Sequence, residues 1–507
     1  MTAASERKYG AVLSYISILI NLAIGLIVTP IILKSLGDSE YGVYTLIASL
    51  CAYLNIIEQG LADTVVKYYI KFKLEKREDK KEHFCWLVIL INTGLSVLTL
   101  LAGLVLYLII PSIYASTMTV SEIALSQKLL ILMVINLIVS FMFNLYQGIL
   151  TANEKFVFLR VSDIANQVLS NIAIVLVLII GGRAFSLVLI TLIFNAVVSV
   201  SKFVCCKLQK EGHCGKHKGV FEKSVYLELL KYLLAVLFAV VIEQVYWRLG
   251  NIIISLAIGT AAITIYSIGM SFHKYLMRFA TTISKIMSPK VFKEVLRNDG
   301  AQAVTDEWIK LSRIQAIGIY LAISGLIVFG REFLTLWVGK GYTESYWIIL
   351  VTLIPYSFEL VGNLRNIILQ AHNLYMKRNI LMLGAALICI GVAIVCLQFW
   401  GVVGVALGTG VGVLIGNIAV TWLLKRKKCC YIGQFYKSVY LKLVPILLVI
   451  IALGFVLCYF IPPITWLIFI LEAVAFIGMY FIAIWFFFLT RKEKKLVAGL
   501  LKRKNKN

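Results

Sequence analysis

Long apolar stretches separated by short polar breaks dominate this sequence of 507 residues. Runs such as Trp86 to Ile110 and Trp466 to Leu489 have the length of about 20 residues that a helix needs to cross a hydrocarbon core roughly 30 Å thick. Helices are expected in these runs, because every backbone polar group in lipid must find a partner within its own segment. With 61% hydrophobic and only 15% charged residues, the composition excludes an ordinary soluble protein.

Counting the apolar runs predicts an all-α, polytopic membrane protein with about fourteen transmembrane helices. These helices are expected to begin near Tyr9, Gly42, Trp86, Ser126, Leu159, Phe185, Leu227, Thr260, Ser312, Tyr346, Asn379, Val402, Tyr440 and Ile464. The first apolar run directly follows Arg7 and Lys8, is too long for the core of a signal peptide and has no small-residue cleavage site. We therefore expect it to remain as the first helix.

The net charge of +24 arises from basic residues that gather in alternate breaks between the apolar runs. About 40 of the 49 Lys and Arg residues fall on one side of the membrane in this count. The breaks on the other side hold only Lys34, Arg183, Arg331 and Lys340. The positive-inside rule makes the basic side cytoplasmic, and an even number of helices places both termini there. Because the charges flank membrane spans, they indicate membrane orientation and not nucleic-acid binding.

An internal repeat divides most of the chain into two halves. Gly37 recurs as Gly259, and residues 195–198 recur at 417–420, both at a shift of about 222 residues. The repeat predicts two six-helix bundles related by a pseudo-two-fold axis along the membrane normal, with a cavity between them. The predicted domains are residues 1–220, residues 221–430, and a C-terminal part, residues 431–507, that holds two additional helices and a basic tail.

Ionisable residues inside apolar spans are the candidate functional residues, because they are costly in lipid and tend to face a partner or a cavity. Arg offers a planar fork that suits phosphate oxygens, and Lys adds a mobile positive charge. The predicted substrate-binding cations are Lys274, Arg278, Arg365 and Arg248. The acidic and polar residues expected to pair with them, or to take up a driving H+ or Na+, are Glu58, Asp63, Glu243, Glu359 and Asn363. The alternative is structural: such side chains also snorkel to the interface, end helices or join neighbouring helices.

Two further patterns are interpreted without assigning them chemistry. Metal-ligand types gather at Cys205, Cys206, His213, Cys214 and His217, but their spacing fits no zinc motif closely. In the twelfth predicted helix, Gly404, Gly408, Gly412 and Gly416 form a face without side chains, which favours close helix packing. The sequence contains no catalytic motif, so we expect no catalytic residue, no metal and no cofactor.

Three stretches near the beginning of the chain carry a family resemblance: Thr29-Pro30 followed by residues 36–44, residues 58–61, and Lys67-Tyr68. They resemble the opening of polysaccharide-export proteins of the Wzx type. These proteins belong to the multidrug/oligosaccharidyl-lipid/polysaccharide (MOP) superfamily. The helix count, the duplicated halves and the two added C-terminal helices extend the resemblance over essentially the whole chain.

This resemblance implies a flippase and not an enzyme. It would carry an undecaprenyl-pyrophosphate-linked oligosaccharide from the cytoplasmic to the outer leaflet of the bacterial inner membrane by alternating access, for O-antigen, capsule or exopolysaccharide assembly. The expected partners are this substrate, membrane lipids, and the polymerase and glycosyltransferases of the pathway. Two alternatives stay open: a cation-coupled multidrug exporter of the same superfamily, and a membrane glycan polymerase or ligase, although no external segment is as long as such an enzyme usually needs.

Overall fold

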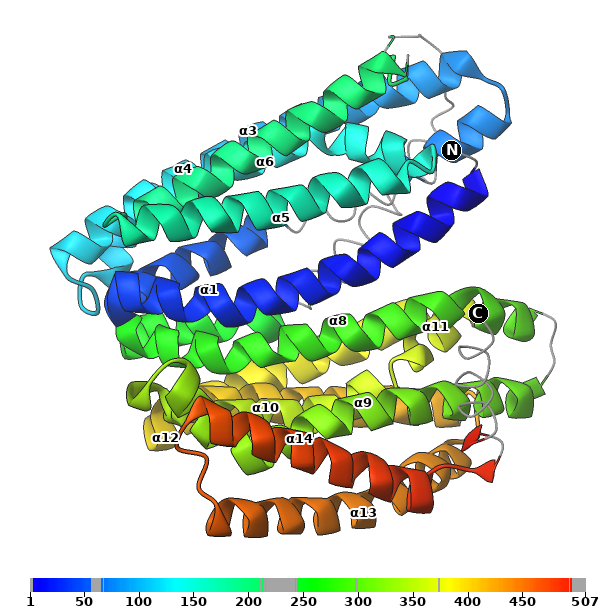
Figure 1. Cartoon of the computed structure of the whole chain (residues 1–507). Helices are drawn as coiled ribbons and strands as arrows, with labels where there is room; N and C mark the ends of the chain where they lie inside the picture. Colours follow the sequence, from blue (N-terminus) through cyan, green and yellow to red (C-terminus); the bar gives the residue numbers. More distant parts are fainter. Residues whose placement is uncertain are drawn as a thin grey trace. The chain divides into compact units, whose positions relative to one another are not determined.

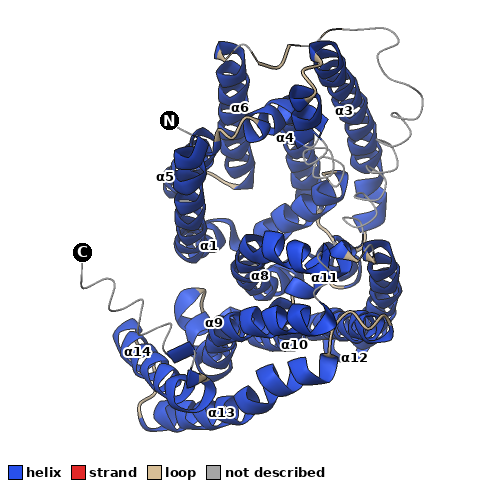
Figure 2. Cartoon of the chain, turned by 90° about the vertical axis from the view of Figure 1, so that its right-hand side faces the viewer, coloured by secondary structure: helices blue, strands red, loops and turns tan. Residues whose placement is uncertain are grey.

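The computed structural model describes residues 3–55, 65–66, 68–209, 211–213, 215, 242, 244–296, 300–372, 374–491 and 493–494. Within these ranges the chain is helical and contains no strand (Figure 2). The N-terminal labelled helices are α1 (Ala3–Leu54), α3 (Glu78–Tyr114), α4 (Val120–Ala152), α5 (Phe156–Ile179) and α6 (Ala184–Leu208). They are followed by α8 (Thr260–Leu296), α9 (Gly300–Trp337), the 3-10 turn η1 (Lys340–Tyr342), α10 (Glu344–Val361), α11 (Leu364–Ala371), α12 (Tyr375–Arg426), α13 (Ile432–Phe460), α14 (Trp466–Ala483) and the π-helical turn η2 (Ile484–Phe488).

The chain divides into two compact units, Met1–Ser267 and Ile268–Asn507. The division falls inside α8, so the first turns of that helix pack with the N-terminal unit. Within each unit the helices run side by side, as Figure 1 shows for α3, α4 and α6 and for α13 and α14. The domain boundaries predicted from the repeat, at residues 220 and 430, stay a prediction.

Two helices are too long to cross a membrane once. Both α1 and α12 contain 52 residues, which corresponds to about 78 Å of helix, more than twice the thickness of a hydrocarbon core. Each is bent where the backbone leaves helical geometry: α1 at Gly37, with φ of 74°, and α12 at Trp400 and Gly401, where Gly401 has φ of 52°. Positive φ is strained for residues with a Cβ, so glycine permits both reversals. Each long helix is therefore two spans joined by a tight turn.

Ten of the described helices are long and apolar enough to cross a membrane. Since α1 and α12 each hold two predicted spans, these ten account for twelve of the predicted segments, and α8 corresponds to another. Of the span predicted from Leu227, the structure describes only the second part, as the helical segment 244–257. The predicted class, an all-α polytopic membrane protein, is confirmed, whereas the division into twelve helices plus two stays a prediction.

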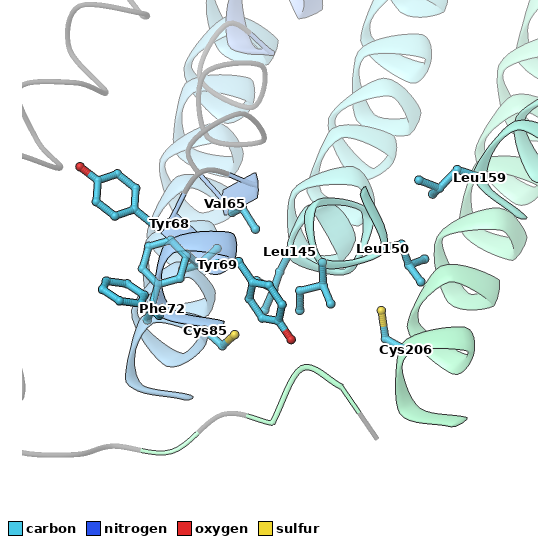
Figure 3. Packing of buried hydrophobic residues seen from close by; sticks show 12 residues of the cluster. Val65, Tyr68, Tyr69, Phe72, Cys85, Leu145, Leu150, Leu159 and Cys206 are labelled. Carbon is cyan, nitrogen blue, oxygen red and sulfur yellow. The ribbon is translucent and has the colours of Figure 1, made fainter. Parts of the chain in front are cut away.

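A core cluster joins the helices of the N-terminal unit at the end that carries the basic loops (Figure 3). It brings side chains from residues 65–72 together with α3, α4, α5 and α6. Its members are Val65, Tyr68, Tyr69, Phe72, Phe84, Cys85, Val88, Leu145, Ile149, Leu150, Leu159 and Cys206. The cluster buries large apolar side chains at the ends of these spans, so it stabilises the packing of the helices at this end.

In the C-terminal unit, the last two helices, α13 and α14, pack against α9. Arg313 on α9 is buried and donates to the backbone oxygens of Ser438 at 2.8 Å and Phe488 at 2.7 Å. Its Nε also donates to Oε1 of Glu493 at 2.8 Å. One guanidinium thus fastens both α13 and η2, the turn that follows α14, to α9, and its charge is matched by a carboxylate, as a buried charge requires.

Candidate functional site

The residue that the structure places most deeply among the predicted cations is Arg365. Helix α10 ends at Val361, and the turn through Gly362 and Asn363 leads into α11, whose second residue is Arg365. The side chain is only 3% exposed. Its Nη1 donates to Oδ1 of Asn417 and, at 3.5 Å, to Oγ1 of Thr421, both on α12. Both direct partners are neutral, and the charged groups that act on Arg365 are the carboxylate of Glu359 and the guanidinium of Arg378.

Glu359, predicted as a polar partner for the cations, pairs with a different arginine. Its Oε1 lies 3.7 Å from Nη2 of Arg378, a residue of α12, and both side chains are largely buried. Arg378 also donates to Oδ1 of Asn379 at 3.1 Å. Asn363 accepts a hydrogen bond of 3.0 Å from Nδ2 of Asn366. The break between α10 and α11 is therefore surrounded by polar contacts to α12.

These residues form what we call the Arg365 cluster, made of Arg365, Glu359, Arg378, Asn363 and Asn417. Its two guanidinium groups face one carboxylate, which leaves one excess positive charge. Nε of Arg365, Nε of Arg378 and Nδ2 of Asn417 are buried without a hydrogen-bond partner in the described part of the chain. Buried donors without a hydrogen bond are rare in folded proteins, because a buried polar group without a partner costs free energy. A cluster with spare donors and excess positive charge suits an anion.

In the N-terminal unit, Arg248 lies on the helical segment 244–257 and is half-buried. The groups that act on its charge are the hydroxyls of Tyr44 and Tyr53 on the second span of α1. One turn further, Nδ2 of Asn251 donates to Oγ of Ser49 at 2.7 Å. Polar contacts thus join this segment to α1 next to Arg248, whose described surroundings are neutral tyrosines.

Lys274 and Arg278 lie four residues apart on α8, on one face of that helix, and both are exposed. Arg278 acts electrostatically on the neighbouring Tyr275. His273 beside them is buried, with its Nδ1 3.0 Å from the backbone oxygen of Met270, so it serves packing. The structure brings neither Lys274 nor Arg278 into the Arg365 cluster.

The remaining predicted site residues, Glu58, Asp63 and Glu243, lie outside the described residues. Cys214 and His217 of the cysteine- and histidine-containing stretch lie outside them as well, and Cys206 belongs to the core cluster. Among the residues that the structure describes, no three His, Cys, Asp or Glu side chains are placed to hold a metal ion.

The comparison with protein families matches residues 34–347, more than half of the chain, to the family described as polysaccharide biosynthesis protein. The chain belongs to the polysaccharide biosynthesis protein family. The resemblance to polysaccharide-export proteins noted in the sequence is thereby confirmed. A comparison with curated protein sequences finds no match.

Solved structures show which fold this polysaccharide biosynthesis protein adopts. The lipid II flippase MurJ in an inward closed conformation has a TM-score of 0.67 and 17% identity, over 94% of this chain and 97% of that one. An inward-facing multidrug resistance MATE family transporter of the MOP superfamily has a TM-score of 0.65 and 13% identity, over 83% and 96%. The Vibrio cholerae MATE transporter VcmN in the bent form has a TM-score of 0.54 and 14% identity, over 84% and 98%. The chain therefore has the MOP transporter fold.

Sequence reasoning missed one polar hub of this family member, Glu122. This residue completes a capping box with Thr119 at the start of α4. Its carboxylate also accepts hydrogen bonds from Ser39 and, at 2.5 Å, from Oγ1 of Thr260. Ser39 and Thr260 follow Gly37 and Gly259, the glycines that the repeat had paired, so Glu122 ties two equivalent turns together. The capping motif was visible in the sequence, but its contacts with distant turns were not.

Proposed function

We propose that this polysaccharide biosynthesis protein is a flippase for an undecaprenyl-pyrophosphate-linked oligosaccharide, and that it acts as a transporter without catalysing a reaction. The observation that carries the proposal is the Arg365 cluster, with its excess positive charge and unused donors. A pyrophosphate headgroup is a multivalent anion, and a guanidinium fork is well suited to it. The proposal extends the substrate class of the lipid II flippase, which shares the fold, to this chain.

The proposed mechanism is alternating access at the level of the two units. Arg365 is buried in the present conformation, so the headgroup reaches it only when the break between α10 and α11 moves away from α12. Excess positive charge then offsets the headgroup charge while the lipid tail stays in the bilayer. Lys274 and Arg278, exposed on α8, would attract the anion before it reaches Arg365. The protein would act in the bacterial inner membrane, next to the glycosyltransferases and polymerase of its pathway.

The rival exporter function is disfavoured by the same cluster. A multidrug exporter of this superfamily would expel organic cations, which need acidic or aromatic surroundings. Two guanidinium groups against one carboxylate repel a cation. The fold does not separate the two functions, because the flippase and the MATE transporter both match it.

The test is a flipping assay in proteoliposomes with an undecaprenyl-pyrophosphate-linked oligosaccharide. Arg365→Gln keeps the size and polarity of the side chain but removes its charge, and we expect flipping to slow by about 10- to 100-fold, since a hydrogen bond to a charged group contributes roughly 1.5–3 kcal/mol. Arg365→Lys keeps the charge without the fork and should lose less. Arg426→Gln removes an exposed arginine from the end of α12 and should leave flipping unchanged.

Thermal unfolding of each variant shows whether the protein is still folded. A folded Arg365→Gln variant that flips as fast as the parent contradicts the assigned role of Arg365. Transport of organic cations by the parent, without flipping of the lipid-linked oligosaccharide, contradicts the proposed function itself.

A further inference from the structure

One buried carboxyl group of the C-terminal unit, that of Glu472, has no hydrogen-bond partner among the described residues. Glu472 lies on α14 and is 4% exposed, and neither of its carboxylate oxygens has a hydrogen-bond partner in the described part of the chain. An ionised carboxylate in this position would have lost its water without gaining a donor or a cation, which is the most unfavourable state for a charge within a membrane span. The arrangement is that of a neutral carboxylic acid.

The surroundings of Glu472 are aromatic. Phe469 and Phe476 lie three residues before and four residues after it, on the same face of α14. Both rings pack against Phe329 on α9, with centroid distances of 6.0 and 5.4 Å. On the side of α13, the ring of Phe476 lies where a side chain at Gly454 would stand. Glu472 thus shares a face of α14 with rings that pack against α9, and the described residues offer its carboxyl group no hydrogen bond.

Among the described elements, α9, α13 and η2 pack against α14. The titratable groups that they direct at Glu472 are Glu332 on α9 and Cys458 on α13, and η2 contributes none. Glu332 carries the same sign of charge as an ionised Glu472. Two neighbouring carboxylates repel each other when both are ionised, so a proton on Glu472 relieves this repulsion.

We propose that Glu472 and Glu332 form a proton-binding site at the interface of α14 and α9. A proton from water forms an O–H bond with a carboxylate oxygen of Glu472, and this removes its charge and its repulsion with Glu332. Glu472 lies six residues from the start of α14 at Trp466, and Glu332 lies five residues from the end of α9 at Trp337. These offsets correspond to about 9 and 7.5 Å along the helices. The positive-inside rule assigns these helix ends to the outer side, so the proton enters from outside.

The use of this site in transport rests on the proposed function. Beyond the other end of α14, Arg313 on α9 fastens η2, which directly follows α14, to α9. A change of charge at Glu472 would therefore act at one end of the α9–α14 pair while Arg313 holds the other end. In this way a proton entering from outside would be coupled to export of the anionic lipid.

The proton itself is tested without any substrate, by infrared difference spectroscopy of the full-length protein in nanodiscs titrated with acid and base. We expect the carbonyl band of a protonated acid at about pH 7, and Glu472→Gln should remove it. Glu332→Gln should keep this band but move its titration to more acidic pH, because removing the negative charge of Glu332 makes ionisation of Glu472 easier. Glu75→Gln, on an exposed loop, should change nothing.

A parent protein without the acid band at about pH 7, or a band that survives Glu472→Gln, overturns the proton site. If the acid band titrates at the same pH in Glu332→Gln as in the parent, Glu332 does not contribute to the proton site. For coupling, flipping by the parent should respond to a pH gradient across the proteoliposome, and flipping by Glu472→Gln should not. Flipping that ignores the gradient in the parent overturns the coupling but leaves the flippase function standing, whereas absence of all flipping overturns the function and leaves the infrared result standing.

Discussion

At the scale of single residues, Glu211 shows how a charge outside the membrane spans is used. It follows the end of α6, and its Oε1 accepts a hydrogen bond of 2.8 Å from Nζ of Lys73. Its Oε2 accepts one of 2.5 Å from the hydroxyl of Tyr69. Burial by itself raises the pKa of Glu211, but the hydrogen bonds from Lys73 and Tyr69 and the charges of Lys73 and Lys81 together lower that pKa below its usual value. The carboxylate therefore joins the end of α6 to the helical segment that precedes α3.

A lowered pKa in the folded protein predicts how stability depends on pH. The contribution of Glu211 is fully present above its unfolded pKa of about 4.3 and is lost as the pH falls through the lower folded value. Glu211→Gln should lower the free energy of unfolding by about 1 kcal/mol at neutral pH and weaken the loss of stability in acid. Thermal unfolding between neutral and acidic pH measures this, with the exposed Glu75→Gln as control. Equal stability of Glu211→Gln and the parent at neutral pH would contradict the role of this contact.

At the scale of elements, the glycines of α12 explain how its two spans approach each other. A Cβ on Gly404 would lie 2.1 Å from the backbone oxygen of Cys396, and one on Gly408 would lie 2.6 Å from the Cα and Cβ of Ala393. These distances are far below van der Waals contact. The backbones of the eleventh and twelfth predicted helices therefore touch along this face, and packing is the role of the glycines, as the sequence indicated.

Substitution of Gly408 should consequently damage this helix pair. Gly408→Val places a branched side chain against backbone atoms of the preceding span, and we expect a loss of about 1–3 kcal/mol or failure to fold. Gly391→Ala is the matched control, because a Cβ at Gly391 meets no atom within 4 Å. The yield of monodisperse protein and its unfolding temperature measure both effects. A Gly408→Val protein as stable as Gly391→Ala would show that the contact is not needed.

At the scale of the whole molecule, orientation in the membrane is decided by where the basic residues lie. The loop at Lys340 after α9 carries few charges, whereas the end of α12 and the following loop contain Lys425, Arg426, Lys427 and Lys428. The energetic bias against moving such clusters across the membrane places the second loop in the cytoplasm.

Labelling from outside tests this orientation. In a variant whose ten native cysteines are replaced, Lys340→Cys and Lys427→Cys each introduce one exposed thiol. A thiol reagent that does not cross membranes should label Lys340→Cys in intact cells and should label Lys427→Cys only after the membrane is opened. The reverse pattern would place the termini outside and would also reverse the side from which a proton reaches Glu472.

Much of the architecture was predictable because it depends on local properties of the chain. The apolar runs predicted the helices and both turns inside α1 and α12, since hydropathy and glycine conformation act over a few residues. Arg365 was predicted as a site residue because an arginine in an apolar span is energetically costly and usually has a functional role. The structure places it in a buried polar cluster. The partners were not predictable: Glu359 pairs with Arg378, and Glu122 contacts turns far away in the sequence.

The sequence by itself determined the all-α membrane class, the approximate number of spans and the family, because these follow from hydropathy, charge and short motifs along the chain. Only the tertiary structure decided which polar group each buried charge meets, and that the buried carboxyl group of Glu472 meets no hydrogen-bond partner among the described residues. The physical reason is that such pairings arise where helices distant in the sequence pack together, and their depth and rotation are set by side-chain packing that no local pattern records.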